Sequence, residues 1–427
     1  MPKSLQYKNS NYIEQAAMFL LIANTANPFF YLSIEMLAIS FLLLTVLMLL
    51  KRGFRYELNK YFWIYAGALC FLQLVQSFVY HVFPLKTFFG EYLRIAFAVL
   101  AICLLGEAFF SRFIRFVYIF AVISLCFYIP CILIKGLVPI LNDLAAHLKA
   151  PFLRPEDDLY ASSSSLIIFN LNQIELGRNS GFYWEPGTHG GFLILAIFLN
   201  LFYRRDSWKS KYNLVFFLCI LTTLSTTTYL ALFFLALFYL SNYFAKRPAL
   251  IVFLLAGMIG LFMASYSKLD FLNKKIEKQI AYSNKGVPGE SRFNSFIADM
   301  KLMRGHEVIG TGRNIEMKFG KNFYNLNHRL IHRNNGVGVL LSTYGIPFFL
   351  LFFFFTWRTF YAVLQTKTNA WMAISLLIVI GFSEDYFFKS FFIALALYSC
   401  VKIIPKTDRT VFRERKLKLG RNLLTYE

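Results

Sequence analysis

Long runs of apolar residues alternate with short polar connections along the whole chain. A helix needs about 20 apolar residues to cross the hydrocarbon core of a bilayer, and most of these runs approach that length. The candidate spans are 13–30, 32–50, 61–83, 91–110, 113–134, 187–203, 212–225, 228–244, 249–266, 336–356, 370–383 and 388–403. The pattern predicts an all-α polytopic membrane protein with about 12 transmembrane helices, forming a single transmembrane domain over residues 1–427.

The charges of the polar connections predict how these helices are oriented. With the N-terminus in the cytoplasm, Lys86 and Lys389 are the only clear basic residues of the short outer connections. The inner cations are Lys51, Arg52, Arg55, Lys60, Arg112, Arg115, Arg204, Arg205, Lys209, Lys211, Lys246, Arg247, Arg358 and Lys367, and the tail 404–427 is also basic. Cytoplasmic connections of membrane proteins carry such an excess of lysine and arginine. Both termini are therefore expected in the cytoplasm.

Two outer loops are much longer than the other connections. They cover residues 135–186 and 266–335, and loops of this length are usually functional. The first contains an amphipathic stretch over 137–148, which is expected to lie in the outer interface. The second contains a helical pattern over 291–304, with Ser291 as its expected N-cap. Both loops are therefore expected to be ordered parts of a working site.

Composition narrows the class of protein further. Hydrophobic residues make up 57% of the chain and charged residues 16%, whereas soluble domains have about 25% charged residues. A soluble enzyme is therefore excluded. The net charge is +21, and the residues that carry it lie between the apolar runs and in the tail. This placement indicates a role in membrane topology rather than in nucleic-acid binding. The six cysteines lie within apolar runs, so neither disulfides nor a thiolate metal site is expected.

The second outer loop has a marked excess of positive charge. It carries 13 lysines and arginines against 6 acidic residues, whereas the first loop carries 4 against 6. This excess suggests an anionic ligand on the outer face. A solvated basic face, or attraction to anionic lipid headgroups, is the alternative explanation of the charge.

The segment 177–191 is the most unusual stretch of the sequence. Its five glycines and Pro186 predict tight turns where the backbone approaches another group closely. Arg178 offers a planar fork that suits a phosphate or pyrophosphate. Glu185 stands near the start of the next helix, where the helix dipole favours a carboxylate. Glu185 is either a functional carboxylate, a helix cap or a partner of Arg178.

The second loop also contains two histidines near the start of a membrane helix. A histidine with a pKa near neutrality is a suitable general base for a sugar hydroxyl, and His328 and His332 are the two candidates. The alternative is that both are solvated loop residues. With Arg292, Arg313 and Arg333 they would form a cationic pocket if all face inward, and Asn334 and Asn335 follow directly before the membrane helix.

Other sequence features point away from common cofactors and energy sources. The acidic cluster Glu156–Asp158 lies in a polar stretch and is not expected to bind a metal. Neither a P-loop nor a G-x-S-x-G motif occurs, so cytoplasmic ATP is not expected to drive the activity, and no cofactor is expected. The hydroxyl-rich run from Ser225 to Tyr229 would either line a sugar pocket or cap the next helix.

Several motifs, taken together, resemble the bacterial O-antigen polymerase/O-antigen ligase superfamily, and most closely the Wzy-type polymerases. The matching segments are Arg178 to Gly187, Ser225 to Tyr229, Ser291-Arg292 with Gly310-Thr311-Gly312, and Asn334-Asn335-Gly336 with Thr343-Tyr344-Gly345. The number of spans and the two large outer loops also match. In layout the resemblance covers most of residues 60–400.

The resemblance implies a C-type membrane glycosyltransferase fold. Such enzymes use a polyprenyl-pyrophosphate-linked oligosaccharide, and the polymerases move the growing chain onto the next lipid-linked repeat unit outside the cytoplasmic membrane. It implies that Arg178 and Arg292 hold the leaving pyrophosphate, with His332 or Glu185 as the base. Arg313, His328, Arg333, Asn334, Asn335 and Tyr229 would bind substrate. A flippase and a chain-length regulator are the implied partners, and no metal is implied.

The sequence departs from the family pattern in two places. Family members have an arginine followed by a glycine after ten residues in both loops, whereas Arg178 is followed by Gly187 or Gly190 and Arg292 by Gly305. Many relatives have a histidine directly before the asparagine at the start of the late helix, whereas Asn334 stands there and His332 lies two residues earlier.

Other functions stay open. A ligase that transfers the finished glycan shares the same motifs. A transporter or flippase would carry charges near mid-membrane, and Glu35, Arg94 and Glu107 are interpreted as isolated or near span ends. An acyltransferase would need a histidine buried in a span.

Overall fold

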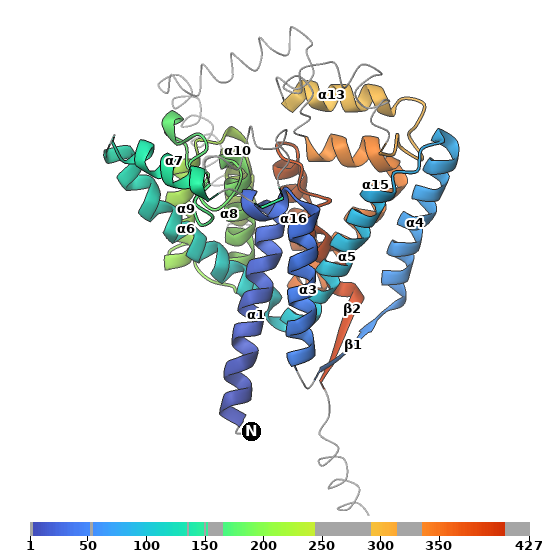
Figure 1. Cartoon of the computed structure of the whole chain (residues 1–427), viewed down its shortest axis with the longest axis horizontal. Coiled ribbons are helices and arrows are strands. Elements are labelled where there is room, and N and C mark those ends of the chain that lie inside the picture. The colour runs from blue at the N-terminus through green and yellow to red at the C-terminus, as the bar shows by residue number, and fades with distance from the viewer. Residues whose placement is uncertain are drawn as a thin grey trace, which may run out of the picture.

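The computed structural model describes residues 3–51, 54–134, 136–148, 151–152, 165–243, 292–313 and 335–405. Helices dominate this part of the chain, as predicted (Figure 1). The first half contains α1 (Lys3–Ala26), α2 (Pro28–Tyr31), α3 (Ile34–Leu50), α4 (Lys60–Tyr80), α5 (Leu85–Leu105), η1 (Gly106–Ala108), α6 (Phe109–Leu133), α7 (Leu137–His147) and η2 (Ile174–Leu176).

The second half continues the helical bundle. It contains α8 (Pro186–Phe202), α9 (Lys211–Thr223), α10 (Thr226–Tyr243), α13 (Arg292–Met303), α15 (Gly336–Leu364), α16 (Lys367–Gly381), α17 (Ser390–Leu397) and η5 (Tyr398–Cys400). Each run predicted as a span overlaps at least one helix, apart from 249–266, which lies outside the described residues, and 388–403 is helical only as far as Cys400. The predicted stretches 137–148 and 291–304 correspond to α7 and α13. Ser291, the expected N-cap of α13, also lies outside the described residues.

A short antiparallel ladder departs from the purely helical prediction. Strand β1 (Phe54–Leu58) pairs with β2 (Val401–Pro405), with Tyr56 opposite Ile403. The last predicted span, 388–403, therefore ends as a strand at Val401. The ladder ties the connection after α3 to the segment after η5, and Asn59 reinforces it by donating from its side chain to the Ser399 carbonyl at 3.0 Å.

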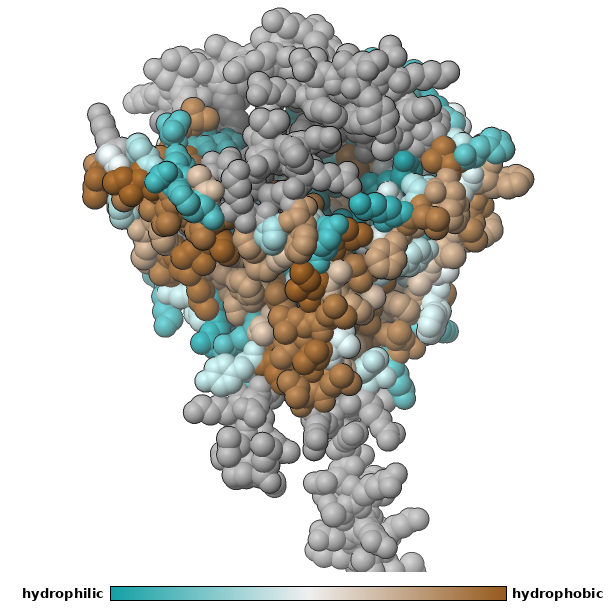
Figure 2. All heavy atoms as spheres, viewed as in Figure 1, coloured by the Kyte–Doolittle hydropathy of each residue, from teal (hydrophilic) through white to brown (hydrophobic). Residues whose placement is uncertain are grey.

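Three helical stretches of the described chain are long and apolar enough to cross a membrane. They are Lys60–Tyr80, Leu85–Leu133 and Gly336–Leu364. Gly106, with a φ of 55°, breaks the second stretch into α5 and α6. The surface of α4 is strongly apolar, because Phe71 is 70% and Phe78 81% exposed. On the face shown in Figure 2, hydrophobic residues gather over the middle of the molecule. A membrane association of these helices explains why such side chains lie on the surface.

The two ends of the bundle have different chemistry. The N-terminal end of α1 and the β1–β2 ladder lie at one end, whereas α7 and α13 lie at the other (Figure 1). Near the first end, Arg112 forms an ion pair with Glu14 at 2.9 Å, and Arg204 donates to the Ser111 carbonyl at 3.0 Å. The predicted inner cations Arg112 and Arg204 thus lie near the same end of the bundle as the N-terminus.

The opposite end of the bundle is shaped by a break in α15. Gly345 has a φ of 77° and interrupts the regular helix, so the first part of α15 runs beneath α13 (Figure 1). A Cβ at Gly345 would overlap the Val308 carbonyl oxygen, which explains why a glycine is required there. At this break the segment 304–313 packs against α15, where the Ile346 amide donates to the Glu307 carbonyl at 2.8 Å and the Thr311 amide to the Ser342 carbonyl at 2.7 Å. The candidate site is built at this end.

Candidate functional site

An arginine that bridges two carboxylates forms the centre of the site. Nη2 of Arg292, the first residue of α13, lies 2.9 Å from Oε1 of Glu185 and 3.0 Å from Oε1 of Glu384. Glu185 stands at the N-cap position of α8, and Glu384 lies in the turn between α16 and α17. The Trp184 indole donates to Oε2 of Glu384 at 3.4 Å. Elements far apart in sequence thus meet at one charged cluster.

Small residues allow this close approach. A Cβ added at Gly187 would overlap the Glu384 carboxylate, and one at Gly336 would overlap the Glu384 carbonyl oxygen. The Tyr386 hydroxyl donates to the carbonyl oxygen of Gly187 at 3.2 Å, which fixes the turn against the first turn of α8. Tight turns were predicted in 177–191, and Gly187 shows that the group approached there is Glu384.

The two carboxylates have opposite electrostatic environments. Burial favours the protonated form of Glu185, but Arg292 outweighs it and lowers the pKa of Glu185 to about 2. Burial raises the pKa of Glu384 well above its usual value, and the charge of Glu185 adds to the rise while Arg292 opposes it. The side chain of Glu384 is only 3% exposed, against 20% for Glu185. The pair therefore favours one ionised and one protonated carboxyl group.

Arg178 lies beside this cluster without forming an ion pair in the described residues. Its Nε donates to the Thr223 carbonyl at 3.3 Å, and a second nitrogen donates to the Gln173 side chain. Its charge interacts with those of Glu185 and Arg292. The ion-pair partner of Glu185 is thus Arg292 rather than Arg178, and Glu185 forms no side-chain cap on α8.

Asn335 and Tyr229 have structural contacts next to this cluster. Asn335 caps α15 by accepting from the Gly338 amide at 2.8 Å, and it donates to the Arg292 carbonyl at 3.4 Å. The Tyr229 hydroxyl donates to the Leu221 carbonyl at 2.9 Å, and its ring lies close enough to Arg178 for electrostatic interaction. Both residues therefore border the site, and their predicted role in substrate binding stays a prediction.

Arg313 belongs to a second charged cluster. Its Nε donates to Oε1 of Glu91 at 2.7 Å, and its Nη2 donates to the Tyr344 hydroxyl at 2.9 Å. Tyr344 also donates to Glu91, at 2.7 Å, and Gln73 donates to the other carboxylate oxygen at 2.6 Å. Glu91 is completely buried. The prediction grouped Arg313 with Arg292, whereas Arg313 has an acidic partner of its own on α5.

Two further cations surround the Arg313–Glu91 pair. Arg94 interacts electrostatically with Arg313, Glu91 and Asp385, and Lys389 interacts with Asp385, Arg94 and Arg313. Arg94, which was interpreted as isolated or near a span end, therefore has charged neighbours from other segments. Helix α5 thus brings Arg94 within electrostatic range of Asp385, in a turn more than two hundred residues further along the chain.

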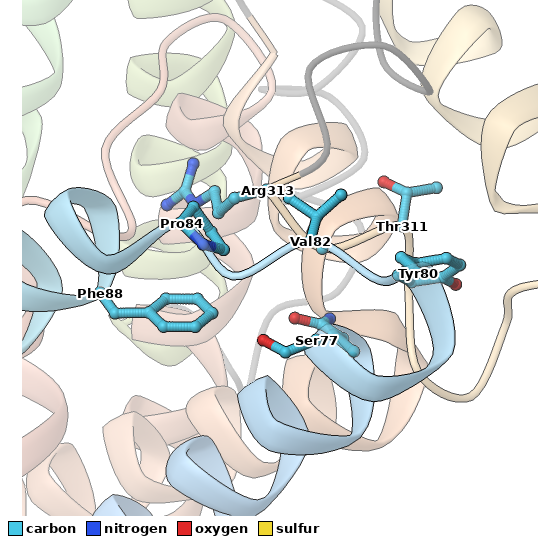
Figure 3. Close-up of a pocket in the computed structure, with 9 residues that line it drawn as sticks. Ser77, Tyr80, Val82, Pro84, Phe88, Thr311 and Arg313 are labelled. Atoms are coloured by element: carbon cyan, nitrogen blue, oxygen red, sulfur yellow. The ribbon is translucent and has the colours of Figure 1, made fainter.

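A small open pocket lies at the base of Arg313. It is shallow and open to solvent, and Figure 3 shows Ser77, Tyr80, Val82 and Thr311 around it. The guanidinium group of Arg313 extends past Pro84 and away from Thr311 (Figure 3). The pocket therefore opens between the end of α4 and the segment 311–313, beside the second cluster rather than inside the first.

His328, His332, Arg333 and Asn334 lie outside the described residues, as does the acidic cluster Glu156–Asp158. Across the described ranges, no group of histidine, cysteine and acidic side chains could hold a metal ion. The structure thus brings together Arg178, Glu185 and Arg292 of the predicted catalytic residues, with Asn335 and Tyr229 at their border.

The sequence prediction missed two central acids, Glu384 and Glu91. Glu384 is adjacent to Asp385 in a turn of only a few residues between two apolar runs, where a pair of acids is unusual. Glu91 opens the predicted span 91–110 as an acid three residues before Arg94. Charges inside or between apolar runs were the available signal, because a membrane environment makes them costly unless they are paired.

Comparisons with known proteins add no family to this description. No protein-family model matches the chain, and no curated protein is detectably similar to it.

Proposed function

We propose that this protein is a membrane glycosyltransferase that polymerises polyprenyl-pyrophosphate-linked oligosaccharide repeat units on the outer face of the bacterial cytoplasmic membrane. The observation that carries the proposal is the cluster of Arg178, Glu185 and Arg292 at the end of the bundle opposite the start of α1. A cluster of partly buried cations and carboxylates at the end of apolar helices suits an anionic, lipid-linked substrate that approaches along the membrane surface.

The proposed topology has twelve spans with both termini in the cytoplasm. The apolar stretches Lys60–Tyr80, Leu85–Leu133 and Gly336–Leu364 support membrane association. The grouping of Arg112, Arg204 and Glu14 at one end supports the inner assignment of that end. The site would then face the outer side, where lipid-linked repeat units delivered by a flippase are available. A chain-length regulator is the second proposed partner.

The proposed reaction is an inverting displacement at the anomeric carbon of the donor sugar. The acceptor hydroxyl oxygen forms the new bond, the bond to the pyrophosphate oxygen breaks, and the hydroxyl proton passes to a base. Arg178 and Arg292 would stabilise the charge that develops on the leaving pyrophosphate, a contribution that is often the largest in catalysis. The reaction as proposed needs neither a nucleotide sugar nor ATP.

The charge balance of the site constrains the choice of base. Because Arg292 lowers the pKa of Glu185, this carboxylate is a weak base while the ion pair is intact. A pyrophosphate that bound Arg292 would compete with Glu185 for the same guanidinium group and release the carboxylate, which would raise its basicity. We therefore propose that substrate binding activates Glu185. His332 is the alternative base.

The decisive experiment is a reaction with purified protein and a pyrophosphate-linked oligosaccharide lipid from its own host, analysed on a gel. A ladder of longer lipid-linked glycans is expected, and the Arg178→Ala/Arg292→Ala double variant should give none. Arg304→Ala removes an exposed cation from the segment that follows α13 and is the matched control. Long chains from the double variant would refute the assignment of both arginines.

Two other outcomes of this experiment would replace the proposed function by another. Transfer that occurs only after a second acceptor is added would make the protein a ligase, since the same motifs and cluster suit either enzyme. A transporter or flippase is the second candidate, and the buried Glu91, paired with Arg313, favours it, because buried charges inside the bundle are typical of transport pathways. Movement of the lipid across a vesicle bilayer without glycan extension would establish that candidate.

A further inference from the structure

A buried histidine packs against the turn that follows Arg178. His189 belongs to the first turn of α8 and is completely buried, as is Tyr183. The imidazole ring stacks on the Tyr183 ring, with centroids 5.2 Å apart and an interplanar angle of 25°. A Cβ at Gly181, which has a φ of 56°, would lie 2.7 Å from Cε1 of His189. The ring thus lies directly against the turn 179–183, where only a glycine leaves room for it.

The same ring has one polar contact with this turn. Nδ1 of His189 lies 3.5 Å from the carbonyl oxygen of Asn179, a completely buried residue. Because a carbonyl oxygen only accepts, Nδ1 carries the hydrogen of this bond. Within the described ranges, no other donor reaches this oxygen, and Nε2 of His189 has no hydrogen-bond partner. Loss of the Nδ1 donor would therefore leave a buried carbonyl unpaired, which destabilises the turn.

Asn179 immediately follows Arg178 and is held firmly by its neighbours. Its amide donates to the Thr222 carbonyl at 3.0 Å, and its Nδ2 donates to the Thr222 hydroxyl at 2.9 Å. Its Oδ1 accepts from the Gly181 amide at 2.9 Å. Arg178 itself donates from Nε to the Thr223 carbonyl at 3.3 Å. The position of Arg178 is thus set by the C-terminal end of α9 and by the contacts of Asn179.

His189 also lies one helical turn after Glu185. Its backbone amide donates to the Glu185 carbonyl at 3.1 Å, at the start of α8. The first turn of α8 therefore begins after the carboxylate that pairs with Arg292 and ends with the ring that contacts Asn179. The charges of Arg178 and Glu185 interact across this turn. One residue thus links the segment of Arg178 to the Glu185–Arg292 pair.

We infer that His189 is a positioning residue, which holds the turn 179–183 on α8 and so sets the distance between Arg178 and the Glu185–Arg292 pair. Its side chain is completely buried, so it acts through Arg178 rather than by touching the substrate. Stabilisation of a leaving group depends on such placement, because a displacement of about 1 Å can cost about a hundredfold in rate. The effect on glycan extension rests on the proposed function, whereas the support of the turn does not.

Two amide substitutions distinguish the nitrogen positions of the ring. Asparagine places an amide nitrogen close to the position of Nδ1, whereas glutamine places it near that of Nε2. His189→Asn should keep kcat for glycan extension within about threefold of the wild type, and His189→Gln should lower it about tenfold. The KM for the lipid-linked donor should change less than kcat, because Arg178 acts on charge that develops in the transition state.

Another histidine supplies the matched control. His147 is exposed, and its Nδ1 lies 2.8 Å from the Asp143 carbonyl oxygen of its own helix α7. His147→Gln should leave both kcat and KM unchanged, since no element of the site packs on this ring.

Hydrogen–deuterium exchange of the full chain in detergent, measured by mass spectrometry, tests the positioning without using the activity. Peptides that cover 178–184 should exchange about tenfold faster in His189→Gln than in the wild type or in His189→Asn. Peptides that cover α4 should exchange equally in all three proteins. His189→Phe keeps the ring but not the donor, so it should resemble His189→Gln and replaces that variant if glutamine prevents folding.

The two measurements separate this inference from the proposed function. If the wild type extends glycans and both amide variants extend and exchange like it, the positioning role fails and the polymerase stands. If the wild type extends nothing but His189→Gln loosens 178–184, the support of the turn stands and the polymerase fails. Equal losses in His189→Asn and His189→Gln, with faster exchange throughout the chain, would show a general defect in folding and overturn the positioning role.

Discussion

Glu185 and Glu384 accept hydrogen bonds from the same nitrogen atom of Arg292, at 2.9 and 3.0 Å. A single guanidinium charge cannot neutralise two carboxylates, so either a proton or a second cation must complete the balance. The raised pKa of Glu384 and the nearby charge of Arg178 offer both solutions. The cluster is thus sensitive to any change that adds or removes one charge.

Removal of the shared cation should destabilise the protein, and removal of one carboxylate should partly reverse the loss. Arg292→Gln leaves two carboxylates facing each other, and breaking a buried pair in this way costs about 3–5 kcal/mol. Because the Arg292 side chain is 25% exposed, we expect about 2–3 kcal/mol. Arg292→Gln/Glu384→Gln should unfold at a higher temperature than Arg292→Gln alone. Thermal unfolding in detergent measures both, and additive effects would contradict coupling of the two residues.

Stability should depend on pH through both carboxylates, with opposite signs. The folded-state pKa of Glu384 is raised above its usual 4.5, so its stabilising contribution is present below about 4.5 and is lost as the pH rises through the folded value. The pKa of Glu185 is lowered to about 2, so its contribution is present above about 4.5 and is lost as the pH falls toward 2.

The variant Glu384→Gln tests the loss of stability that is expected as the pH rises and Glu384 ionises. The wild type and this variant should have similar melting temperatures at low pH, where Glu384 is protonated, and the variant should become the more stable one as the pH rises. Melting temperatures from pH about 4 to about 9 test this, with the exposed Glu175→Gln as the control. A constant difference between Glu384→Gln and the wild type across this range would rule out titration of Glu384.

The sequence predicted the helices well because burial in lipid or in a helical core imposes long apolar runs. The start of α8 at Pro186 and of α15 at Gly336 match the predicted runs to within one residue. The β1–β2 ladder was missed because Val401 to Ile404 reads as the end of an apolar span, and its partner at Phe54–Leu58 is far away in sequence. Strand pairing at such separation leaves no local signal.

The site was predicted only in part, because the ion-pair partner of each charged residue depends on tertiary contacts. Arg178 and Glu185 stood out through their glycine-rich surroundings, but the sequence favoured no particular partner for Glu185. Arg292 supplies that partner from a different loop, and Glu384 from a short turn. Arg94 looked isolated because its neighbours Arg313 and Lys389 come from segments more than two hundred residues away. Distances between segments of this kind are set by packing, which a single sequence does not reveal.

A methyl group at Gly187 should disrupt the site without disrupting the helix. The Cβ of Gly187→Ala would overlap the Glu384 carboxylate, so the carboxylate must move away from Arg292. We expect at least a tenfold loss of glycan extension. Gly67→Ala is the matched control, because a Cβ there meets no atom within 4 Å, and alanine stabilises a helix by about 0.5–1 kcal/mol relative to glycine.

A second substitution tests whether steric overlap is the cause. Glu384→Asp shortens the side chain by one methylene group, so Gly187→Ala/Glu384→Asp should recover part of the activity lost by Gly187→Ala. If the double variant is as inactive as Gly187→Ala, or less active, the loss does not arise from contact between Gly187 and Glu384.

The proposed orientation in the membrane makes a prediction for two exposed positions at opposite ends of the bundle. Arg205 follows α8 close to the inner cluster of Arg204 and Arg112, whereas Glu307 follows α13 at the end that carries the site. In a background without the six native cysteines, Glu307→Cys should react with a membrane-impermeant thiol reagent in intact cells. Arg205→Cys should react only after the membrane is permeabilised. The reverse pattern would put the Arg292 cluster in the cytoplasm, where lipid-linked repeat units awaiting polymerisation are not expected, and would remove the main support for a polymerase.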